Sequence, residues 1–350
     1  MTKTKVCILV NEDSEDHKSW LDACKDYSEE IELLEIDLIK NDWIEQLKNF
    51  SPNVCLLKPS GRTSLYRQLY QERVEVIIRD LGYNVFPSYD ELRIYENKRY
   101  FAYWANANRI PHPKTWIFYS RREAIEFSRT CIFPVVAKLN IGASGKGVRI
   151  IKNRKDLVLY IEQIFSKGVA SKTGPRLDKG KVLARLWSKL INPKQLLNRL
   201  NAYSQIAADK QKGFVIFQEF IPHNYEWRAV RIGDSFFAHK KLKMGEKASG
   251  SLLKNYDNPP LELLDFIKEI TDKFCFKSVA VDVFETSEGG YLINEIQCIF
   301  GQSDSYQMLV DGTPGRYMFT NGAWNFEAGD FNKNQSYNLR LEYILNNIEQ

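Results

Sequence analysis

The first ninety residues alternate between short apolar runs and amphipathic stretches, and this alternation constrains the fold more than any other feature of the chain. Strands are predicted at 6–10, 31–36, 54–58 and 84–87, and helices between them at 16–25, 42–50 and 64–81. Strands joined through helices run parallel, so this segment predicts a small parallel sheet with helices on both faces. The first strand is followed by Asn11-Glu12-Asp13 instead of GxGxxG, so no dinucleotide site is predicted.

The overall composition narrows the class of protein. A chain of 350 residues with 44% hydrophobic content has room for two or three ordered domains. No apolar run approaches the roughly 20 residues that span a bilayer, and the first residues predict a strand instead of a signal peptide. The six cysteines are scattered without a CxxC pair. We therefore expect reduced thiols, a cytoplasmic protein and no zinc site.

A glycine-rich loop follows a strand-like run near residue 140. The run ends at Lys138, and residues 142–147 read Gly-Ala-Ser-Gly-Lys-Gly. Glycines let a backbone approach a phosphate closely and adopt positive φ, and Lys138 adds a fixed cation. The spacing differs from that of a P-loop. Taken alone, the loop is also typical of an ordinary glycine-rich hairpin turn.

Two carboxylates lie on a second pair of predicted strands. Asp282 and Glu295 are separated by a Gly289-Gly290 turn, and Gln297 follows two residues after Glu295, so these two side chains share a face. Magnesium takes a few hard oxygen ligands while phosphates fill its other positions. Asp282 stands within Val-Ala-Val-Asp-Val-Phe, where a buried carboxylate must be paired or metal-bound. The segment predicts a magnesium site; an exposed face of an edge strand is the alternative.

The remaining elements surround these motifs. Helices are expected at 95–108, 121–129, 156–165 and 261–274. Strands are expected at 115–119, 133–137 and 214–219, with hairpins at 226–232/235–243 and 279–285/291–296.

Residues 167–212 carry the basic charge of the chain. Eleven Lys and Arg against two Asp and Glu give this segment +9, whereas the whole chain carries +5. Its apolar residues recur at helical spacing with a break near Pro193, and Lys181, Arg185 and Lys189 lie on the opposite face. Three interpretations stay open: a solvated helical excursion, a lid or docking surface for an acidic substrate, and an interfacial helix touching anionic lipid or a lipid-linked substrate. Few aromatics interleave with the cations, so nucleic acid is not an expected partner.

The order and spacing of the motifs resemble the ATP-grasp superfamily. The matching residues are Lys98, Lys138, the 142–147 loop, Gln218-Glu219-Phe220-Ile221, Glu226-Trp227-Arg228, Asp282, Asn294-Glu295-Ile296-Gln297 and Gly301. Within the superfamily the chain looks most like the ribosomal-protein glutamate ligase (RimK-like) branch. The resemblance implies an α/β (α+β) ATP-grasp fold with a Rossmann-like pre-grasp domain. The predicted domains are 1–92, 93–310 with the basic insertion 167–212, and an aromatic-rich tail 311–350.

The resemblance also implies roles for individual residues. Those expected to contact the ATP phosphates are Lys98, Lys138, Gly142, Ser144, Gly145 and Gly147. Those expected to bind the nucleoside are Glu219 and Ile221, through backbone groups at the adenine, and Glu226 at the ribose. The expected ligands of one or two Mg²⁺ ions, which Mn²⁺ can replace, are Asp282, Glu295 and Gln297. The catalytic candidates are Arg228, Lys241 and Lys243, although a lysine on a strand is more often solvated.

The function implied by this resemblance is an ATP-dependent carboxylate–amine ligase that works through an acylphosphate, on an acidic or glycan-linked carboxylate. A homodimer is a candidate assembly. Three departures stand out: Gln297 replaces the usual asparagine, Phe300-Gly301 replaces Pro-Gly, and Ala280 stands where some ligases have arginine. These departures keep two other functions open, an ATP-grasp kinase acting on a hydroxyl and a non-catalytic ATP-binding regulator.

Overall fold

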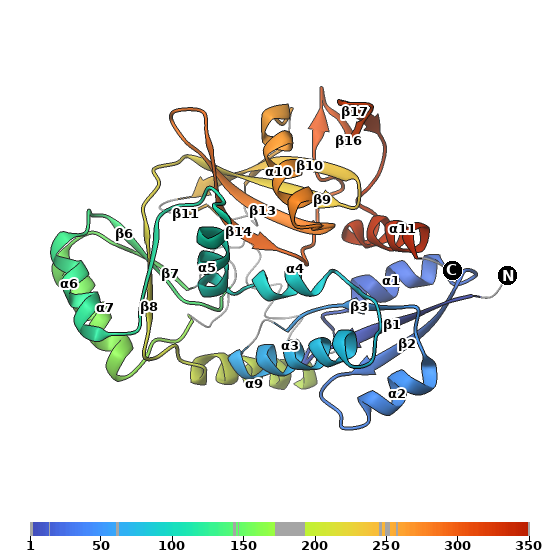
Figure 1. Ribbon diagram of the computed structural model, residues 1–350, viewed down its shortest axis with the longest axis horizontal. Helices are drawn as coiled ribbons and strands as arrows, with labels where there is room; N and C mark the ends of the chain where they lie inside the picture. Colours follow the sequence, from blue (N-terminus) through green and yellow to red (C-terminus); the bar gives the residue numbers. More distant parts are fainter. Residues whose placement is uncertain are drawn as a thin grey trace. The chain divides into compact units, whose positions relative to one another are not determined.

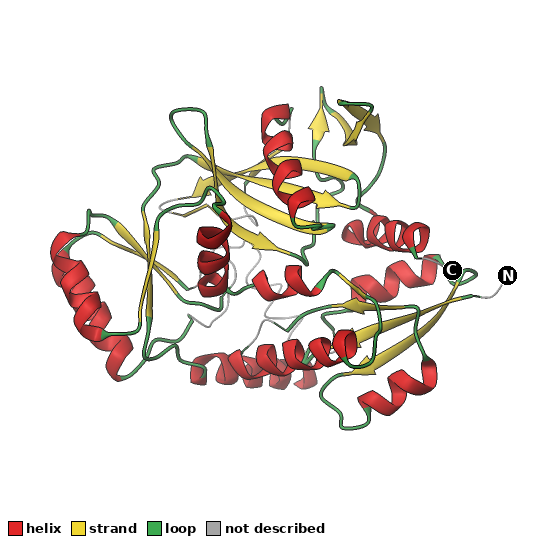
Figure 2. Cartoon of the chain, viewed as in Figure 1, coloured by secondary structure: helices red, strands yellow, loops and turns green. Residues whose placement is uncertain are grey.

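The protein is described here by a computed structural model that divides into two compact units. It describes residues 3–13, 15–60, 63–142, 145, 147–171, 193–244, 247–248, 253–256 and 258–348. Unit 1 consists of Met1–Ser60, Tyr66–Pro113 and Ile221–Gln350, and unit 2 of Gly61–Leu65 and Lys114–Phe220. Each unit is built around its own sheets (Figures 1 and 2).

The N-terminal part of unit 1 is a four-stranded parallel sheet in the order β2-β1-β3-β4. Its strands are β1 (Thr4–Val10), β2 (Ile31–Asp37), β3 (Val54–Leu57) and β4 (Val85–Phe86). Its helices are α1 (Lys18–Asp26), α2 (Trp43–Phe50), α3 (Ser64–Arg79) and α4 (Tyr89–Ile94). The alternation of strands and helices predicted this parallel sheet correctly.

Helices cover both faces of the parallel sheet because its side chains alternate. Val6 and Ile8 of β1 point to α1 and to α11 (Tyr337–Asn347), a helix from the far end of the chain. Cys7 and Leu9 point to α2 and α3 on the other face. The expected tail 311–350 thus includes a helix that completes the core of the N-terminal sheet.

The second sheet of unit 1 has nine strands, in the order β14-β13-β9-β10-β16-β15, with β11, β12 and β17 at its margins. The strands are β9 (Tyr225–Ile232), β10 (Ser235–Met244), β11 (Lys247–Ala248), β12 (Lys254–Asn255), β13 (Ser278–Glu285), β14 (Tyr291–Gln297), β15 (Leu309–Val310), β16 (Thr313–Thr320) and β17 (Ala323–Ala328). The helices are α5 (Lys98–Asn108), α10 (Leu261–Lys273) and the 3₁₀ turn η1 (Lys333–Ser336). Both α5 and α10 pack on one face of this sheet.

Unit 2 is a smaller antiparallel sheet in the order β5-β8-β6-β7. The strands are β5 (Thr115–Phe118), β6 (Val135–Lys138), β7 (Val148–Ile151) and β8 (Val215–Glu219), and the helices are α6 (Arg121–Thr130), α7 (Arg154–Ser166) and α9 (Pro193–Ala208). The helices α6 and α7 lie side by side, and their apolar residues pack on β6 and β8 (Figure 1).

One predicted helix has the wrong boundary. The expected helix 95–108 begins three residues later, at Lys98, and the separate helix α4 precedes it. Glu96 has a positive φ of 49°, which interrupts the helix, and the side chain of Asn97 caps α5 by accepting the N–H of Tyr100 at 3.2 Å. The break places Glu96 and Lys98 beside each other at a helix start.

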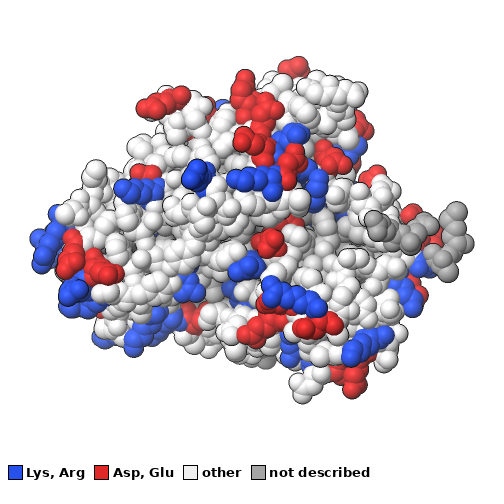
Figure 3. Space-filling view, in the orientation of Figure 1, with Lys and Arg blue, Asp and Glu red and all other residues white. Residues whose placement is uncertain are grey.

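Two further observations concern the possible membrane-spanning helices and the surface charge of the protein. Within the described ranges, each helix is too short or too polar to cross a membrane. Figure 3 shows Lys and Arg interspersed with Asp and Glu on the visible face. Residues 172–192, which include Lys181, Arg185 and Lys189 of the basic insertion, lie outside the described residues.

Candidate active site

The candidate active site in unit 1 is on the face of the nine-stranded sheet opposite α10. Trp227 and Ala229 of β9 pack with α10, so their neighbours Glu226 and Arg228 point to the other face. Arg228 is the direct cross-strand partner of Asp282 on β13. The same register places Glu226 opposite Lys241 and Asp282 opposite Glu295. Residues that lie 13 to 69 positions apart in the sequence are therefore neighbours in two adjacent rows of cross-strand pairs.

A bulge in β14 turns Glu295 toward the site. Val283 pairs with Ile293 while Asp282 pairs with Glu295, so Asn294 is an extra residue. In a regular strand Ile293 and Glu295 would share a face; the extra residue reverses the alternation. Ile293 consequently packs in the core with α10, and Glu295 lies on the side of Asp282.

Asp282 is held by two cations at once. Arg228 grips it with two hydrogen bonds, from Nε to Oδ1 at 2.9 Å and from Nη2 to Oδ2 at 3.1 Å. The Nζ of Lys241 donates to Asp282 Oδ2 at 2.6 Å and to Glu226 Oε2 at 2.9 Å. Glu226 also accepts from Asn294 Nδ2 at 3.4 Å. The network thus joins one expected ribose ligand, two catalytic candidates and one expected metal ligand: Glu226, Arg228, Lys241 and Asp282.

Burial and charge act in opposite directions on this network. Burial raises the pKa of the Asp282 carboxyl, but the charges of Arg228 and Lys241 outweigh it and hold that pKa well below its usual range. Burial lowers the pKa of Lys241, and the charge of Asp282 reverses this and raises it above its usual value. The side chains of Asp282, Arg228 and Lys241 are therefore all charged at neutral pH. Lys241 is only 5% exposed, so the alternative that this candidate is a solvated strand lysine is wrong.

Lys98 joins Glu295 from the start of α5. Its Nζ lies 3.5 Å from Glu295 Oε1 and 3.5 Å from Glu96 Oε2. Burial lowers the pKa of Lys98, but the charges of Glu295 and Glu96 raise it overall. Glu96 is buried and was missed by the sequence analysis, although a carboxylate two residues before a predicted phosphate-binding lysine could have indicated it.

The donor set fits a magnesium ion that arrives with phosphates. Glu295 Oε1 is buried and has no hydrogen-bond partner among the described residues. Gln297 lies on the same face and contributes an amide oxygen. The described residues contain no group of three or more His, Cys, Asp or Glu side chains arranged to hold a metal. Phosphate and water oxygens would therefore complete the coordination, as is usual for Mg²⁺.

Apart from Lys98, the expected phosphate-contacting residues belong to unit 2. Lys138 ends β6 and is buried. The loop after it links β6 to β7, with Leu139 N–H donating to the Gly147 carbonyl at 2.8 Å. Gly145 has a φ of 70°, which favours glycine. The described part of the loop, which includes Gly142, is thus a hairpin turn, and Ser144 lies outside the described residues.

The predicted adenine-binding segment follows β8. The Oε1 of Glu219 accepts the N–H of Lys114 at 2.6 Å, which ties the end of β8 to the start of β5. The carbonyl of Ile221 accepts a hydrogen bond from His223 Nδ1 at 2.7 Å. Lys243 is half-buried two residues beyond Lys241 on β10. The roles of Glu219, Ile221 and Lys243 stay predictions.

The sequence analysis also missed His239. It is the cross-strand partner of Arg228 on β10, and its Nδ1 donates to the Gln307 carbonyl at 2.9 Å. Burial, together with the charge of Arg228, lowers the pKa of His239 to about 3. The imidazole is therefore neutral beside the charged network, and it supplies packing and polarity without adding a third cation near Asp282.

Comparisons with known proteins agree with this fold. No protein-family profile matches the chain. The chain is 25% identical over 230 residues, 63% of its length, to the alpha-aminoadipate–LysW ligase LysX of Saccharolobus solfataricus, of which it covers 67%. Its fold is similar to that of a RimK domain ATP-grasp protein from Sphaerobacter thermophilus, with a TM-score of 0.52 and 15% identity, covering 84% of this chain and 90% of that one.

A second similar structure contains a nucleotide. It is the biotin carboxylase domain of a 2-oxoglutarate carboxylase from Hydrogenobacter thermophilus, in complex with MgADP, ADP and bicarbonate. The TM-score is 0.55 at 12% identity, over 87% of this chain and 66% of that one. These likenesses show that the chain has the ATP-grasp fold. The predicted resemblance to RimK-like ATP-grasp ligases is thereby confirmed.

Proposed function

We propose that the protein is an ATP- and Mg²⁺-dependent ligase that joins a carboxylate to an amine through an acylphosphate. The observation that carries the proposal is the network in which Arg228, Lys241 and Asp282 meet beside Glu295, in a chain similar to the ligase LysX. Within unit 1, Glu226 would bind the ribose and Lys98 the phosphates; the phosphate-contacting roles of Lys138 and the glycine loop in unit 2 stay predictions.

The proposed reaction has two steps. First, a substrate carboxylate oxygen attacks the γ-phosphorus of ATP, the bond to the β–γ bridging oxygen breaks and ADP leaves. Second, the amine attacks the acyl carbon, the carbon–oxygen bond to phosphate breaks, and the amine loses a proton. Phosphoryl transfer needs positioning and charge neutralisation more than a protein nucleophile. The magnesium, when bound, would supply Lewis-acid neutralisation of the phosphate oxygens.

The residues of the network fit separate tasks. Arg228 and Lys241 are fixed cations whose positions are set by Asp282, so they need little reorganisation to face a developing negative charge. Glu295 and Gln297 would bind the metal, with Lys98 balancing Glu295. The +9 charge of residues 167–212 supports an acidic or glycan-linked carboxylate as substrate, and a cytoplasmic location fits the six free cysteines.

Phosphate release from Mg-ATP tests the proposal. The enzyme is supplied with pools of amino acids, acidic peptides and uronic acids, with and without amines. Release that needs both a carboxylate and an amine is expected. A phosphorylated product without free phosphate would indicate a kinase instead, and nucleotide binding without any turnover would indicate a regulator.

Matched variants tie the activity to the site. Glu295→Gln removes the charge of a predicted metal ligand and should reduce phosphate release by about 100-fold or more. Glu285→Gln is the control on the same hairpin, because Glu285 accepts from Tyr225 and Trp227. Equal activity in the two variants would exclude Glu295 from the reaction.

A further inference from the structure

The helix α3 buries an arginine whose hydrogen bonds are incomplete. Arg67 is only 6% exposed, and its Nη1 donates to the carbonyl of Tyr95. Its Nε and Nη2 are buried and have no hydrogen-bond partner among the described residues. An unpaired guanidinium edge in the interior is costly, and such groups are normally satisfied by an acceptor.

The unsatisfied edge of Arg67 is the one that Arg228 uses for a carboxylate. Arg228 binds the two oxygens of Asp282 with Nε and Nη2, at 2.9 and 3.1 Å. The planar fork of arginine matches a carboxylate or a phosphate in this geometry. Among the described residues, the Nε and Nη2 of Arg67 have no acceptor, whereas the same two groups of Arg228 are bound to Asp282.

Arg67 lines a tight crevice. The other lining residues are Pro59, Ser60, Tyr70, Gln71, Leu92 and Tyr95, and the crevice is too tight to admit a water-sized sphere. Its walls would therefore have to move apart for a carboxylate to enter. Pro59 and Ser60 follow the end of β3, and the carboxyl ends of parallel strands are where α/β sheets usually bind ligands.

The surrounding charges disfavour a dianion more than a monoanion. Burial lowers the pKa of Arg67, and the charge of Glu96 is the strongest opposing influence, with a smaller one from Glu12. The Oε1 of Glu12 accepts from the hydroxyl of Ser60 at 2.7 Å, so this carboxylate lies at the rim of the crevice. A phosphate dianion would meet two carboxylates and one cation there, whereas a carboxylate carries half that charge.

The crevice is connected to the candidate active site through four consecutive residues. Arg67 binds the carbonyl of Tyr95, Glu96 pairs with Lys98, and Lys98 pairs with Glu295. All of these residues belong to unit 1. A group bound at Arg67 is thus linked by direct contacts to a predicted metal ligand.

We propose that the Arg67 crevice is a carboxylate-binding subsite that anchors a non-reacting carboxylate of the substrate. A bidentate contact with Nε and Nη2 would engage both oxygens of that carboxylate, so a different carboxylate would attack ATP. The assignment of the ligand as a substrate rests on the proposed ligase function. The existence of the anion site does not rest on it, and the two are tested separately.

The direct test is ¹⁵N NMR of arginine side chains in the full-length protein, without ATP. The Nε–H signal of Arg67 is identified by its absence in Arg67→Lys. Acetate and glutarate should shift this signal, whereas acetamide, chloride at matched ionic strength and inorganic phosphate should leave it in place. Absence of a shift with both carboxylates would overturn the site, and an equal or larger shift with phosphate or chloride would overturn its assignment to carboxylates.

A matched variant separates binding from structure. Arg73 lies on the same helix and donates to the carbonyls of Leu38 and Lys40, so Arg73→Lys alters an arginine that has internal partners. Glutarate should raise the Tm of the wild type and of Arg73→Lys but not that of Arg67→Lys. A rise of equal size in all three proteins would place the glutarate elsewhere and overturn the proposal.

A kinetic test addresses the link to catalysis. With a substrate pair found by phosphate release, Arg67→Lys should raise the KM of the carboxylate substrate at least 10-fold and change the KM of ATP less than 2-fold. Parallel changes in both constants would overturn the anchoring role. If no substrate pair is found, the NMR result still decides whether the anion site exists.

Discussion

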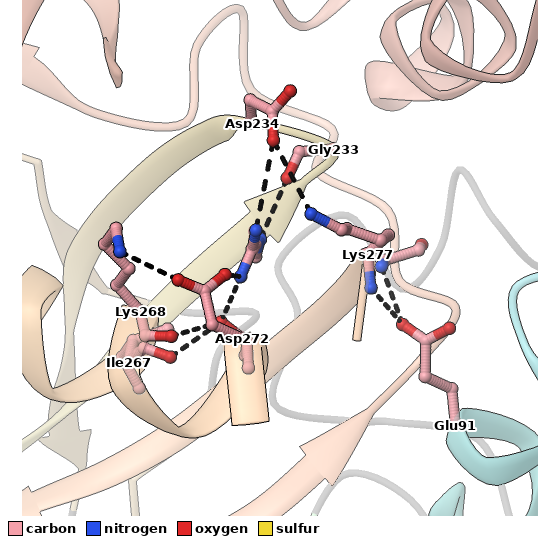
Figure 4. A network of polar contacts seen from close by, with 10 residues as sticks. Glu91, Gly233, Asp234, Ile267, Lys268, Asp272 and Lys277 are labelled. Carbon is pink, nitrogen blue, oxygen red and sulfur yellow. Dashed lines mark hydrogen bonds and ion pairs between the residues drawn. The ribbon is translucent and has the colours of Figure 1, made fainter. Parts of the chain in front are cut away.

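Two polar networks lie on opposite faces of β9, and their partners differ in kind. Arg228, on one face, contacts the side chains of the Asp282 network. Arg231, on the other face, donates to the backbone carbonyl of Gly233 at 2.9 Å, to Thr271 Oγ1 at 2.7 Å and to Asp272. Figure 4 shows this second network, with Asp272 also bound by Lys268 and Asp234 contacted by Lys277.

The difference indicates what each network does. The Arg231 network ties a turn, a helix and a strand together through a backbone carbonyl, a hydroxyl and a carboxylate, which is a structural task. The hydrogen bonds of Arg228 and Lys241 join charged side chains to one another, and Glu295 beside them has a buried oxygen that accepts no hydrogen bond from the described residues. A buried ion pair is weak evidence for stability, so a cluster of this composition is better explained by function.

Replacing Arg228 or Arg231 by lysine would distinguish a catalytic task from a structural one. The larger effect is expected for Arg228→Lys. Arg228→Lys keeps the charge but loses the bidentate fork on Asp282. Phosphate release should fall by about 100-fold, because a misplaced cation no longer meets the developing charge. Steady-state kinetics on folded enzyme measure this, and activity within threefold of wild type would show that Arg228 is structural.

Arg231→Lys should have the converse effect. A lysine cannot reach Gly233, Thr271 and Asp272 together, so buried acceptors lose partners and the free energy of unfolding should fall by about 2–3 kcal/mol. Turnover per folded molecule should stay near that of the wild type. Urea unfolding with parallel kinetics checks both statements, and a loss of turnover without a loss of stability would reverse the assignment of the two networks.

The sequence predicted the pieces of the site but not how they are joined. The alternation of apolar and polar residues identified the hairpins that carry Arg228, Lys241, Asp282 and Glu295. It could not reveal the bulge at Asn294. A bulge is defined by two residues of one strand pairing with one residue of its partner, so it can be recognised only when the partner strand is known. The burial of Lys241 depends on the same cross-strand pairing, which is a long-range property.

Residues far apart in the chain explain the other omissions. Arg67 reads as a polar position on an amphipathic helix, and its burial results from the packing of the segment around Tyr95. The helix α11 reads as part of a separate tail, yet it fills the core of the N-terminal sheet with Leu341 and Ile344. Local patterns predicted the elements well because they depend on neighbouring residues, whereas these contacts depend on the fold as a whole.

Glu91 and Asp282 sharpen the comparison, because both are buried carboxylates with opposite pKa shifts. Asp282 has two cations, whereas Glu91 is held by backbone N–H groups of Lys277 and Ser278, at 2.9 and 2.7 Å (Figure 4). For Glu91 burial dominates, and its pKa is raised from 4.5 to about 7. The folded protein then binds this proton more tightly than the unfolded chain does, so the contribution of Glu91 to stability is greatest below pH 4.5 and is lost as the pH rises through 7.

This shift predicts the smallest of the three effects. Between pH 5 and pH 8 the titration of Glu91 should lower the free energy of unfolding by roughly 2 kcal/mol. Glu91→Gln cannot ionise, so its stability should fall less over that interval, although Gln costs stability at every pH because its amide faces backbone donors. Urea unfolding of both proteins at pH 5 and pH 8 measures the difference. Equal pH dependence in the wild type and in Glu91→Gln would mean that the backbone donors keep Glu91 ionised. The backbone donors would then compensate the burial of Glu91 as fully as two cations compensate the burial of Asp282.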